Sequence, residues 1–430
     1  MQLTIRTAKA PIQANVIIPG SKNIAYRAII LSALADGVCE ISGLQVSENI
    51  KLLIAALREL GIVTQLDEAS RYCIIAGGNG KLPKKQATLW CHDSLTLSYL
   101  LMAICSATSG VYYFDGSASL RERPLTFMMN TLSRQGIQFI PGDSQKMPFT
   151  LVGADTLEGG EVILDHTANQ HIASALLMIA PFARSPFTFT LHETVNQSHI
   201  DMTCAMMAEF GVLVHRIHQR QLMVPVPQRY HAKDYVVEPD FAIAAYFFAA
   251  AAVTGGEITI QPVKLAQSKQ PNAKFLTILE KMGCRIRETK TGLTLSGPAQ
   301  LQGIEVSMRD FADTFLALAA IAPFAKSPVR ISHLGPLRQK EKSRMTAMKT
   351  ELTKMGIQVE TGEDWIKIFP GSPLGGVINT HADARIAMAA AIIGLKAPGV
   401  IIDDAKYAEK TCPEFFSLWE KLAEPLNISA

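Results

Sequence analysis

Two cations stand beside a predicted helix start near the beginning of the chain. The segment PGSKNIAYR places Lys22 and Arg27 five residues apart, after a Gly-Ser turn and where an apolar helix begins. Helix N-termini carry partial positive charge and free N–H groups, so they bind anions. Cations there oppose the helix dipole and destabilise the helix unless an anion joins them. The pattern therefore indicates an anion site, against the plainer interpretation of two solvated surface residues.

Later helix starts and the segments that follow them carry charges of both signs. The phrases are RDFADT, RQKEKSR, NTHADAR and AKYAEKT, and their candidate residues are Asp313, Lys340, Glu341, Arg344, Arg385 and Lys410. A single charge run is usually a solvated helix start. Taken together, the cations suit phosphate and carboxylate groups, and the carboxylates suit proton transfer. The set predicts chemistry on small anions.

An internal repeat accounts for the elements that position these residues. A helix end, a glycine and a short β-branched strand recur at Gly61, Gly136, Gly211, Gly283 and Gly356, with a nearly constant spacing. Each glycine is predicted to end a helix in the left-handed conformation that glycine adopts without strain. The period of about 73 residues is longer than that of a solenoid and predicts repeated α/β units.

A second phrase recurs out of phase with the first. It is a nearly all-apolar, alanine-rich helix, a turn and a strand, with turns at Gly37, Gly110, Pro186, Gly256, Pro328 and Gly399. A helix that is apolar all round is predicted to be buried on all sides. The six copies are therefore expected to form the centres of two lobes. The N-terminal strand is expected to complete the sixth unit, so that both chain ends lie in one lobe.

Composition excludes several classes of protein. With 48% hydrophobic and 18% charged residues the chain is globular, and 430 residues favour two domains. A net charge of +3 argues against nucleic-acid binding, and the alanine-rich runs are too short for a membrane span. The seven scattered cysteines favour neither a metal site nor a disulfide framework. We expect a cytoplasmic protein, and a monomer by default.

These motifs together resemble the enolpyruvyl transferases, and among them the EPSP synthase (3-phosphoshikimate 1-carboxyvinyltransferase) family. The resemblance rests on PGSK with Arg27, Asp313, the KE-x-x-R phrase, the Asp-x-Arg of the sixth apolar helix and a late Lys-Thr, and it covers the whole chain. It implies a two-lobed, inside-out α/β barrel of six βαβαββ repeats, three in each lobe. The expected lobes are residues 20–232, and residues 1–19 with 233–430, with the active site in the cleft between them.

The resemblance also implies a reaction and a ligand set. The enolpyruvyl group of phosphoenolpyruvate would pass to a hydroxyl of shikimate-3-phosphate by addition and elimination, releasing phosphate without metal or cofactor. Asp313 would take the hydroxyl proton and Glu341 would protonate the enol carbon, or the reverse, with Lys22 as a third catalytic residue. Phosphoenolpyruvate would be held by Lys22, Arg344, Arg385 and Lys410. The acceptor would be held by Asn23, Arg27, Asn169, Gln170 and His171, with Lys340 between the two substrates.

Several positions of the first lobe depart from the family pattern. The glycine-rich phrase that opens the second apolar helix is replaced by His92-Asp93-Ser94. An expected arginine is Ser119, and Arg121 is either its replacement or a surface residue. A serine pair and glutamine are replaced by Asn169-Gln170-His171, a tyrosine by His199 and an asparagine by Pro336. Lone histidines are more often structural than ligands.

Three functions are compatible with this pattern. The first is the EPSP synthase reaction with altered ligands. The second is enolpyruvyl transfer to a different acceptor, either a phosphorylated cyclic compound or a nucleotide, which the altered first-lobe residues favour. The third is a non-catalytic paralogue, which the retained cations and carboxylates of the second lobe argue against. We adopt the first, with phosphoenolpyruvate and a phosphorylated acceptor as the binding partners.

Overall fold

The chain forms two compact units. The computed structural model describes residues 1–142, 145–290, 292–334 and 339–423, with the backbone alone for 339–342 and 423. The N-terminal unit comprises residues 20–237, and the C-terminal unit comprises residues 1–19 with 238–430. Each unit has its own hydrophobic core. Among the described residues, no helix is both long enough and apolar enough to cross a bilayer.

The N-terminal unit contains three four-stranded sheets, ordered β14-β3-β5-β4, β6-β7-β9-β8 and β10-β11-β13-β12. Their strands are β3 (Val38–Ser42), β4 (Val63–Asp67), β5 (Tyr72–Ala76), β6 (Gln86–Trp90), β7 (Gly110–Asp115), β8 (Gln138–Ile140), β9 (Phe149–Gly153), β10 (Gly160–Leu164), β11 (Phe187–Leu191), β12 (His215–His218), β13 (Gln221–Val224) and β14 (Tyr235–Val236). The helices are α1 (Lys22–Leu34), α2 (Glu48–Glu59), α3 (Leu95–Ser106), α4 (Ala118–Arg121), α5 (Thr126–Ser133), α6 (Gln170–Ile179), the 3₁₀ turn η1 (Ala180–Phe182) and α7 (Gln197–Glu209).

The C-terminal unit repeats this plan with sheets ordered β16-β17-β15-β2, β18-β19-β21-β20 and the three-stranded β1-β23-β22. Its strands are β1 (Leu3–Thr4), β2 (Gln13–Ile17), β15 (Glu257–Gln261), β16 (Arg285–Glu288), β17 (Leu293–Ser296), β18 (Glu305–Ser307), β19 (Val329–Ser332), β20 (Val359–Thr361), β21 (Ile366–Ile368), β22 (Gly376–Ile378) and β23 (Val400–Ile402). Its helices are α8 (Phe241–Thr254), α9 (Phe275–Lys281), α10 (Phe315–Ile321), α11 (Gln339–Lys354), α12 (Ala384–Gly394) and α13 (Phe415–Glu420). Short 3₁₀ turns are η2 (Leu265–Gln267), η3 (Pro271–Lys274), η4 (Ala312–Thr314), η5 (Ala322–Phe324), η6 (Ala405–Lys410) and η7 (Lys421–Ala423).

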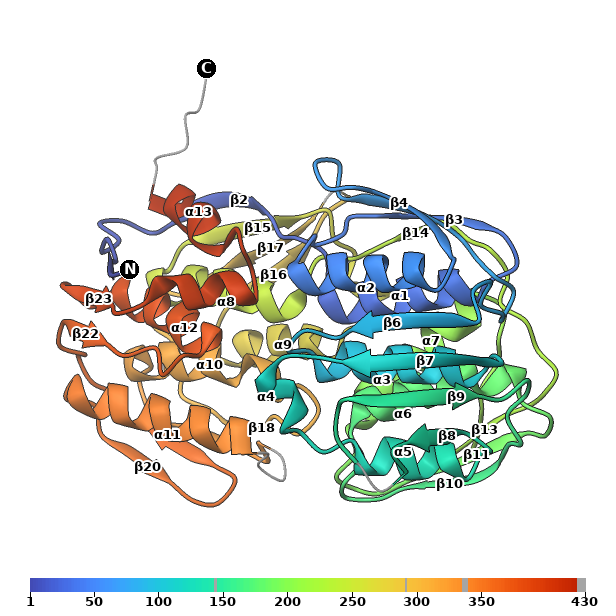
Figure 1. Ribbon diagram of the computed structural model, residues 1–430. Coiled ribbons are helices and arrows are strands. Elements are labelled where there is room, and N and C mark those ends of the chain that lie inside the picture. The colour runs from blue at the N-terminus through green and yellow to red at the C-terminus, as the bar shows by residue number, and fades with distance from the viewer. Residues whose placement is uncertain (143–144, 291, 335–338, 424–430) are drawn as a thin grey trace. The chain divides into compact units, whose positions relative to one another are not determined.

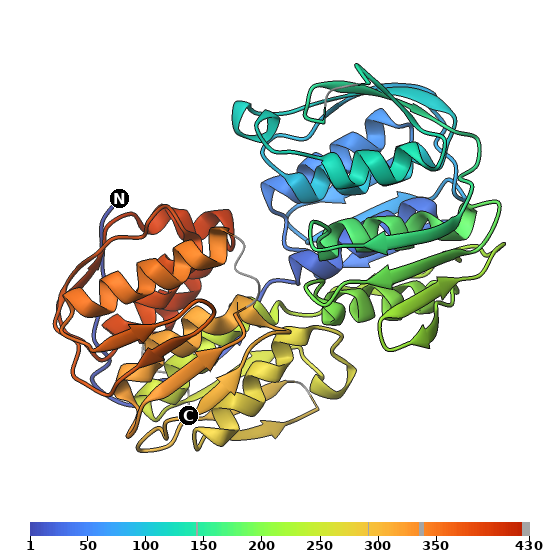
Figure 2. The same ribbon diagram turned by 90° about the horizontal axis from the view of Figure 1, so that it is seen from below.

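One sheet shows the repeating unit. Strand β6 leads through α3 to β7, which pairs with it in parallel, and β9 then pairs antiparallel with both β7 and β8. The parallel pair needs a crossover helix, whereas the hairpin needs only a turn. The βαβαββ order expected from the sequence is therefore confirmed in this unit. Figure 1 shows strands β6, β7 and β9 lying over α3 and α6, whereas α11 lies on the outside of its own unit, and Figure 2 shows the same units from below.

The six alanine-rich helices are the buried ones. They are α1, α3, α6, α8, α10 and α12, and almost every residue in each is buried. All five predicted glycines end a helix with positive φ, between 81° and 103°. Both expectations from the repeat are confirmed, because continuous apolar runs and left-handed glycines are local properties.

The N-terminal strand divides into two. Strand β1 pairs antiparallel with β23 and joins the sixth unit, as expected, while β2 pairs in parallel with β15 of the fourth. Strand β14 in turn pairs with β3. Since this pairing keeps residues 235–236 in the N-terminal unit, the chain leaves that unit at residue 237 and not at 232.

Candidate active site

In the C-terminal unit, the start of α12 lies against the predicted catalytic aspartate. Arg385 is the second residue of α12, and its Nη1 donates to Oδ1 of Asp313 and, over 3.0 Å, to the backbone oxygen of Asp313. Asp313 lies in η4, which directly precedes α10. Burial disfavours the charged form of Arg385, but Asp313, Tyr246 and Asp383 together outweigh it and raise the pKa of Arg385 above its ordinary value. The arginine is therefore held charged at the helix start.

A second arginine reaches the same helix start from α11. Nε of Arg344 lies 2.8 Å from Oδ2 of Asp383, and the two side chains are only 9% and 15% exposed. Oδ1 of Asp383 accepts a hydrogen bond from the backbone N–H of Arg385, which caps α12. Burial alone would raise the pKa of Asp383, but Arg344 holds it below its usual range. Asp313, Arg344 and Arg385, which the sequence selected, are thus joined into one cluster through Asp383.

A cavity of about 210 Å³ lies beside this cluster, between α11 and α12. It is lined by Ser343, Arg344, Ala347, His381, Ala382, Asp383 and Ile386. The guanidinium of Arg344, the hydroxyl of Ser343 and the start of α12 face this space and suit an anion, while the carboxylate of Asp383, which pairs with Arg344, also lines it.

The remaining predicted residues of this unit lie on neighbouring elements. Lys410 ends η6, which packs against α12, and its exposed ammonium lies 4.8 Å from the ring centre of Tyr407. Lys340 and Glu341 lie on the first turn of α11, but their side chains are outside the described residues. Pro336 is likewise outside the described residues.

In the N-terminal unit, Arg27 is buried where three helices meet. Only 3% of it is exposed. Its Nε donates to Oγ1 of Thr203 on α7 and its Nη2 to Oγ of Ser174 on α6, both over 2.7 Å, and its Nη1 donates to the backbone oxygen of Asn23. Burial lowers the pKa of Arg27 to about 10, so it remains charged at neutral pH. Among the described residues no carboxylate pairs with this buried cation, which leaves its charge available to an anionic ligand.

The predicted acceptor ligands lie at the starts of α1 and α6. Lys22 and Asn23 open α1, and Lys22 lies over the ring of Tyr26. Asn169 is the N-cap of α6, where its Oδ1 accepts from the backbone N–H of His171 over 2.8 Å. Arg27 joins the two helices, because Ser174, which it binds, also donates to the backbone oxygen of Gln170. These helix starts are therefore linked through one arginine.

The departures from the family pattern have structural partners. Arg121 forms a two-pronged ion pair with Asp115 at the end of β7, with hydrogen bonds of 2.8 and 2.6 Å, and this pair lowers the pKa of Asp115. Arg121 is thus held on its own unit's surface, and half of its side chain is exposed. Ser119 on α4 accepts a long hydrogen bond of 3.4 Å from Arg123. His199 is buried on α7 near Arg27, where its backbone oxygen accepts from Thr203.

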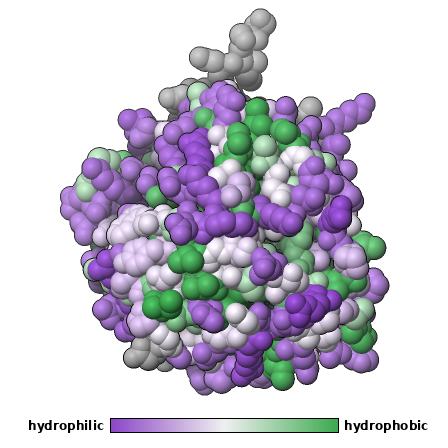
Figure 3. Space-filling model, turned by 45° about the vertical axis from the view of Figure 1, so that its right-hand side comes forward, coloured by the Kyte–Doolittle hydropathy of each residue, from purple (hydrophilic) through white to green (hydrophobic). Residues whose placement is uncertain are grey.

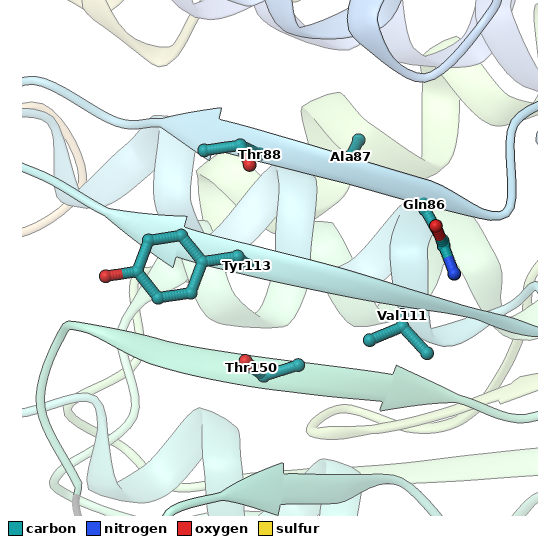
Figure 4. Close-up of a pocket in the computed structure, with 6 residues that line it drawn as sticks. All are labelled: Gln86, Ala87, Thr88, Val111, Tyr113 and Thr150. Atoms are coloured by element: carbon teal, nitrogen blue, oxygen red, sulfur yellow. The ribbon is translucent and has the colours of Figure 1, made fainter.

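A larger cavity of about 360 Å³ lies elsewhere, on the outer face of the sheet β6-β7-β9-β8 (Figure 4). Its lining contains no charged side chain and consists of Gln86, Ala87, Thr88, Val111, Tyr113 and Thr150. Figure 3 shows hydrophobic side chains scattered among hydrophilic ones on one face of the molecule. Single exposed apolar residues are ordinary and indicate no site. Because the lining of this cavity has no cation, the residues suited to binding anions are those of the arginine clusters.

Sequence reasoning assigned no role to several residues of these clusters, although Asp383 and His381 stand in a phrase that it singled out. These residues are Asp383, Glu351 and His381 around α12, and Ser174 and Thr203 around Arg27. A signal existed for two of them. Asp383 stands directly before an apolar helix, as an N-cap does, and Ser174 is a hydroxyl within an otherwise apolar helix. Thr203, Glu351 and His381 gave no signal, because their partners are distant in the sequence.

Comparisons with known proteins identify the family of this chain. Residues 6–419 match the family model described as EPSP synthase (3-phosphoshikimate 1-carboxyvinyltransferase). A protein of Nostoc punctiforme named 3-phosphoshikimate 1-carboxyvinyltransferase is 39% identical over 98% of this chain and 99% of its own. One of the same name from Syntrophobacter fumaroxidans is 34% identical over 96% and 97%.

Solved structures confirm the predicted fold class. EPSP synthase from Acinetobacter baumannii superposes with a TM-score of 0.85 at 23% identity, over 98% of both chains. The enolpyruvyl transferase NikO from Streptomyces tendae gives 0.77 at 16% identity, over 98% of this chain and 97% of its own. At these identities the likeness shows the fold alone. From the family match and the two relatives at 39% and 34% identity, this chain belongs to the EPSP synthase (3-phosphoshikimate 1-carboxyvinyltransferase) family.

Proposed function

We propose that this chain is a 3-phosphoshikimate 1-carboxyvinyltransferase. It transfers the enolpyruvyl group of phosphoenolpyruvate to a hydroxyl of shikimate-3-phosphate and releases phosphate. The observation that carries this proposal is the cluster of Asp313, Arg385, Asp383 and Arg344 at the start of α12, in a chain of this family. It combines a carboxylate for proton transfer with two cations, one buried and one partly exposed, for an anionic substrate.

The binding of phosphoenolpyruvate follows from its two anionic groups. Its phosphate and carboxylate suit the planar forks of Arg344 and Arg385, with Lys410 and Lys22 as additional point charges. Lys22 belongs to the N-terminal unit and the other three to the C-terminal unit. The ligands that we propose for phosphoenolpyruvate therefore come from both units.

The reaction is an addition followed by an elimination. Asp313 removes the proton of the acceptor hydroxyl, whose oxygen adds to C2 of phosphoenolpyruvate while Glu341 protonates C3. The bond from C2 to the phosphate oxygen then breaks, and loss of a proton from C3 restores the double bond. The cations around the site, Lys22 among them, stabilise the departing phosphate. Phosphoenolpyruvate competes with Asp313 for Arg385, so its binding releases the carboxylate to act as the base.

The acceptor is assigned to the N-terminal unit. Arg27 binds its carboxylate, because a buried guanidinium with only neutral partners is a strong site for an anion. The start of α6, with Asn169, Gln170 and His171, binds its phosphate at the positive end of the helix dipole. Lys340 lies between the two substrates, and Asn23 contributes beside Lys22. These substrates are the partners that we propose, for a monomeric cytoplasmic enzyme.

A different acceptor is the second candidate. It is favoured by the start of α6, where Oδ1 of Asn169 is already used as the helix cap and a histidine follows two residues later. This helix start therefore offers the acceptor fewer hydroxyl donors than the serine pair of the family pattern would. One substrate-binding guanidinium is also missing, because Ser119 stands where the family pattern has an arginine. The guanidinium of Arg121 does not replace it, since it is bound to Asp115.

The test is phosphate release from phosphoenolpyruvate in the presence of shikimate-3-phosphate, with Asp313→Ala and Glu341→Ala as controls. Release by the wild type that both substitutions abolish would support the proposed reaction and acceptor. Binding of phosphoenolpyruvate without release would support another acceptor. Absence of binding would reject both candidates in favour of a non-catalytic paralogue.

A further inference from the structure

The carboxylate of Glu351 joins α11 to the turn that precedes α12. Its side chain is 2% exposed. Oε1 lies 2.7 Å from Nε2 of His381 and 2.8 Å from Nζ of Lys354, and Oε2 accepts from the backbone N–H of Asn379 over 3.1 Å. An ionised carboxylate only accepts, so Nε2 of His381 carries the proton of their hydrogen bond. A carboxylate is costly to bury unless it is paired, and two of its three donors come from the segment between β22 and α12.

That segment has an uncommon backbone conformation. His381 and Ala382 are consecutive residues with φ of 50° and 55°, in the left-handed region that side chains with a Cβ rarely adopt. The backbone N–H of His381 also donates to Oδ1 of Asn379 over 2.7 Å. Such a conformation persists only where surrounding contacts impose it. The hydrogen bonds that the carboxylate of Glu351 accepts from His381 and Asn379 supply those contacts.

The turn decides where the substrate-binding arginines lie. The next residue, Asp383, accepts from Arg344 and caps α12, and Arg385 follows two residues later. Arg344 and Glu351 are seven residues apart on α11, which is two helical turns and roughly 10 Å along one face. Helix α11 is therefore tied to the start of α12 at two separated points, and the 210 Å³ cavity lies between the two helices.

We propose that Glu351 and His381 are positioning residues for the phosphoenolpyruvate site, an inference that rests on the function proposed above. Glu351 is buried, and Nε2 of His381 is occupied by its carboxylate, so the pair acts through the turn. Their hydrogen bond holds the left-handed turn in place and so sets the separation of the guanidinium groups of Arg344 and Arg385. Loosening of this turn weakens the binding of phosphoenolpyruvate and leaves the acceptor site, which is built from the other unit, unchanged.

The test compares His381→Ala with Lys354→Ala. Each removes one donor to Glu351, but only the first comes from the turn, since Lys354 is on α11 and 55% exposed. We expect His381→Ala to raise the KM for phosphoenolpyruvate about tenfold, with kcat and the KM for shikimate-3-phosphate within about threefold of wild type. Lys354→Ala should change no constant by more than about twofold. His381→Gln, whose amide N–H can reach the same carboxylate, should restore most of the lost affinity.

Equal effects of His381→Ala and Lys354→Ala, or an unchanged KM for phosphoenolpyruvate in His381→Ala, would overturn the proposal. Backbone hydrogen exchange over residues 379–386 decides the same question without activity. Faster exchange there in His381→Ala than in Lys354→Ala supports the positioning role, and equal rates reject it. A wild-type chain that neither binds nor converts phosphoenolpyruvate would instead reject the proposed function, and the exchange data would still judge the turn.

Discussion

Nε of Arg344 donates to Oδ2 of Asp383 over 2.8 Å, and this carboxylate caps α12 with its other oxygen. One side chain therefore serves two purposes, since it neutralises a buried arginine and begins the helix that carries Arg385. The arrangement explains why two cations can lie beside a helix N-terminus. The aspartate offsets their charge against the helix dipole.

The first prediction concerns this pair. Asp383→Asn keeps a good capping residue but removes the charge that faces Arg344, and we expect it to destabilise the chain by on the order of 3 kcal/mol at pH 7. The pKa of Asp383 is lowered in the folded chain. Its contribution is therefore complete above the unfolded pKa and is lost as pH falls through the folded pKa. The difference from wild type should shrink in acid, as measured by urea unfolding at several pH values.

Asp310→Asn is the matched control for this measurement. Asp310 pairs with Lys274 over 3.2 Å, but both side chains are about half exposed. The substitution should therefore leave the free energy of unfolding almost unchanged. A penalty for Asp383→Asn that is the same at acidic and neutral pH would show that the charge does not cause it.

The second prediction concerns the buried arginine of the N-terminal unit. Arg27→Lys keeps the charge but cannot reach Thr203, Ser174 and the oxygen of Asn23 together, because an ammonium lacks the guanidinium fork. The KM for shikimate-3-phosphate should rise about 10- to 100-fold, with a smaller effect on the KM for phosphoenolpyruvate. Steady-state kinetics with each substrate varied in turn would measure this. An equal rise in both constants would argue against an acceptor site at Arg27.

The third prediction concerns proton transfer. Asp313→Asn retains an oxygen that accepts from Arg385 but has no basicity, so kcat should fall by about 10²- to 10⁴-fold. Rapid-quench measurement of a single turnover, with thermal unfolding to check the fold, would test this. If the chemical step slows by less than about tenfold, Asp313 is not the main base.

The fourth prediction concerns backbone strain in the turn before α12. Ala382 is exposed and has a φ of 55°, which costs a residue with a Cβ about 1–2 kcal/mol. Ala382→Gly removes this strain but adds about 0.4–1 kcal/mol of unfolded-state entropy, so we expect a net stabilisation of roughly 0.5–1 kcal/mol. Ala384→Gly, in the first residue of α12, should have the opposite sign. Denaturant unfolding of both variants would compare them, and the same sign in both would contradict the argument.

The fifth prediction compares two buried tyrosines. The hydroxyl of Tyr246 on α8 is buried without a hydrogen-bond partner in the part of the chain that the structure describes. The hydroxyl of Tyr230 donates to the backbone oxygen of Met178 over 2.8 Å. Tyr246→Phe should therefore stabilise the chain by about 1 kcal/mol, and Tyr230→Phe should destabilise it by a similar amount. Calorimetric unfolding would measure both, and destabilisation by Tyr246→Phe would reveal a partner for its hydroxyl.

Much of the fold follows from local patterns in the sequence. The glycines at 61, 136, 211, 283 and 356 adopt the left-handed conformation predicted for them, and the six alanine-rich helices are buried. Both results depend on a few neighbouring residues, namely a helix end and a continuous apolar run. The pairing of β2 with β15 and of β14 with β3 could not be predicted, because each strand leads into a helix of the unit that it does not join.

The same division holds for the candidate site. The amino-acid sequence by itself determined which residue types stand at the helix starts, Arg27 and Arg385 among them, and these residue types predict small anions as ligands. Only the tertiary structure decided their partners: Arg27 binds Thr203, 176 residues away, and Arg385 binds Asp313, 72 residues away. The physical reason is that periodicity and capping act within a few residues, whereas a hydrogen bond between distant side chains depends on how whole helices pack.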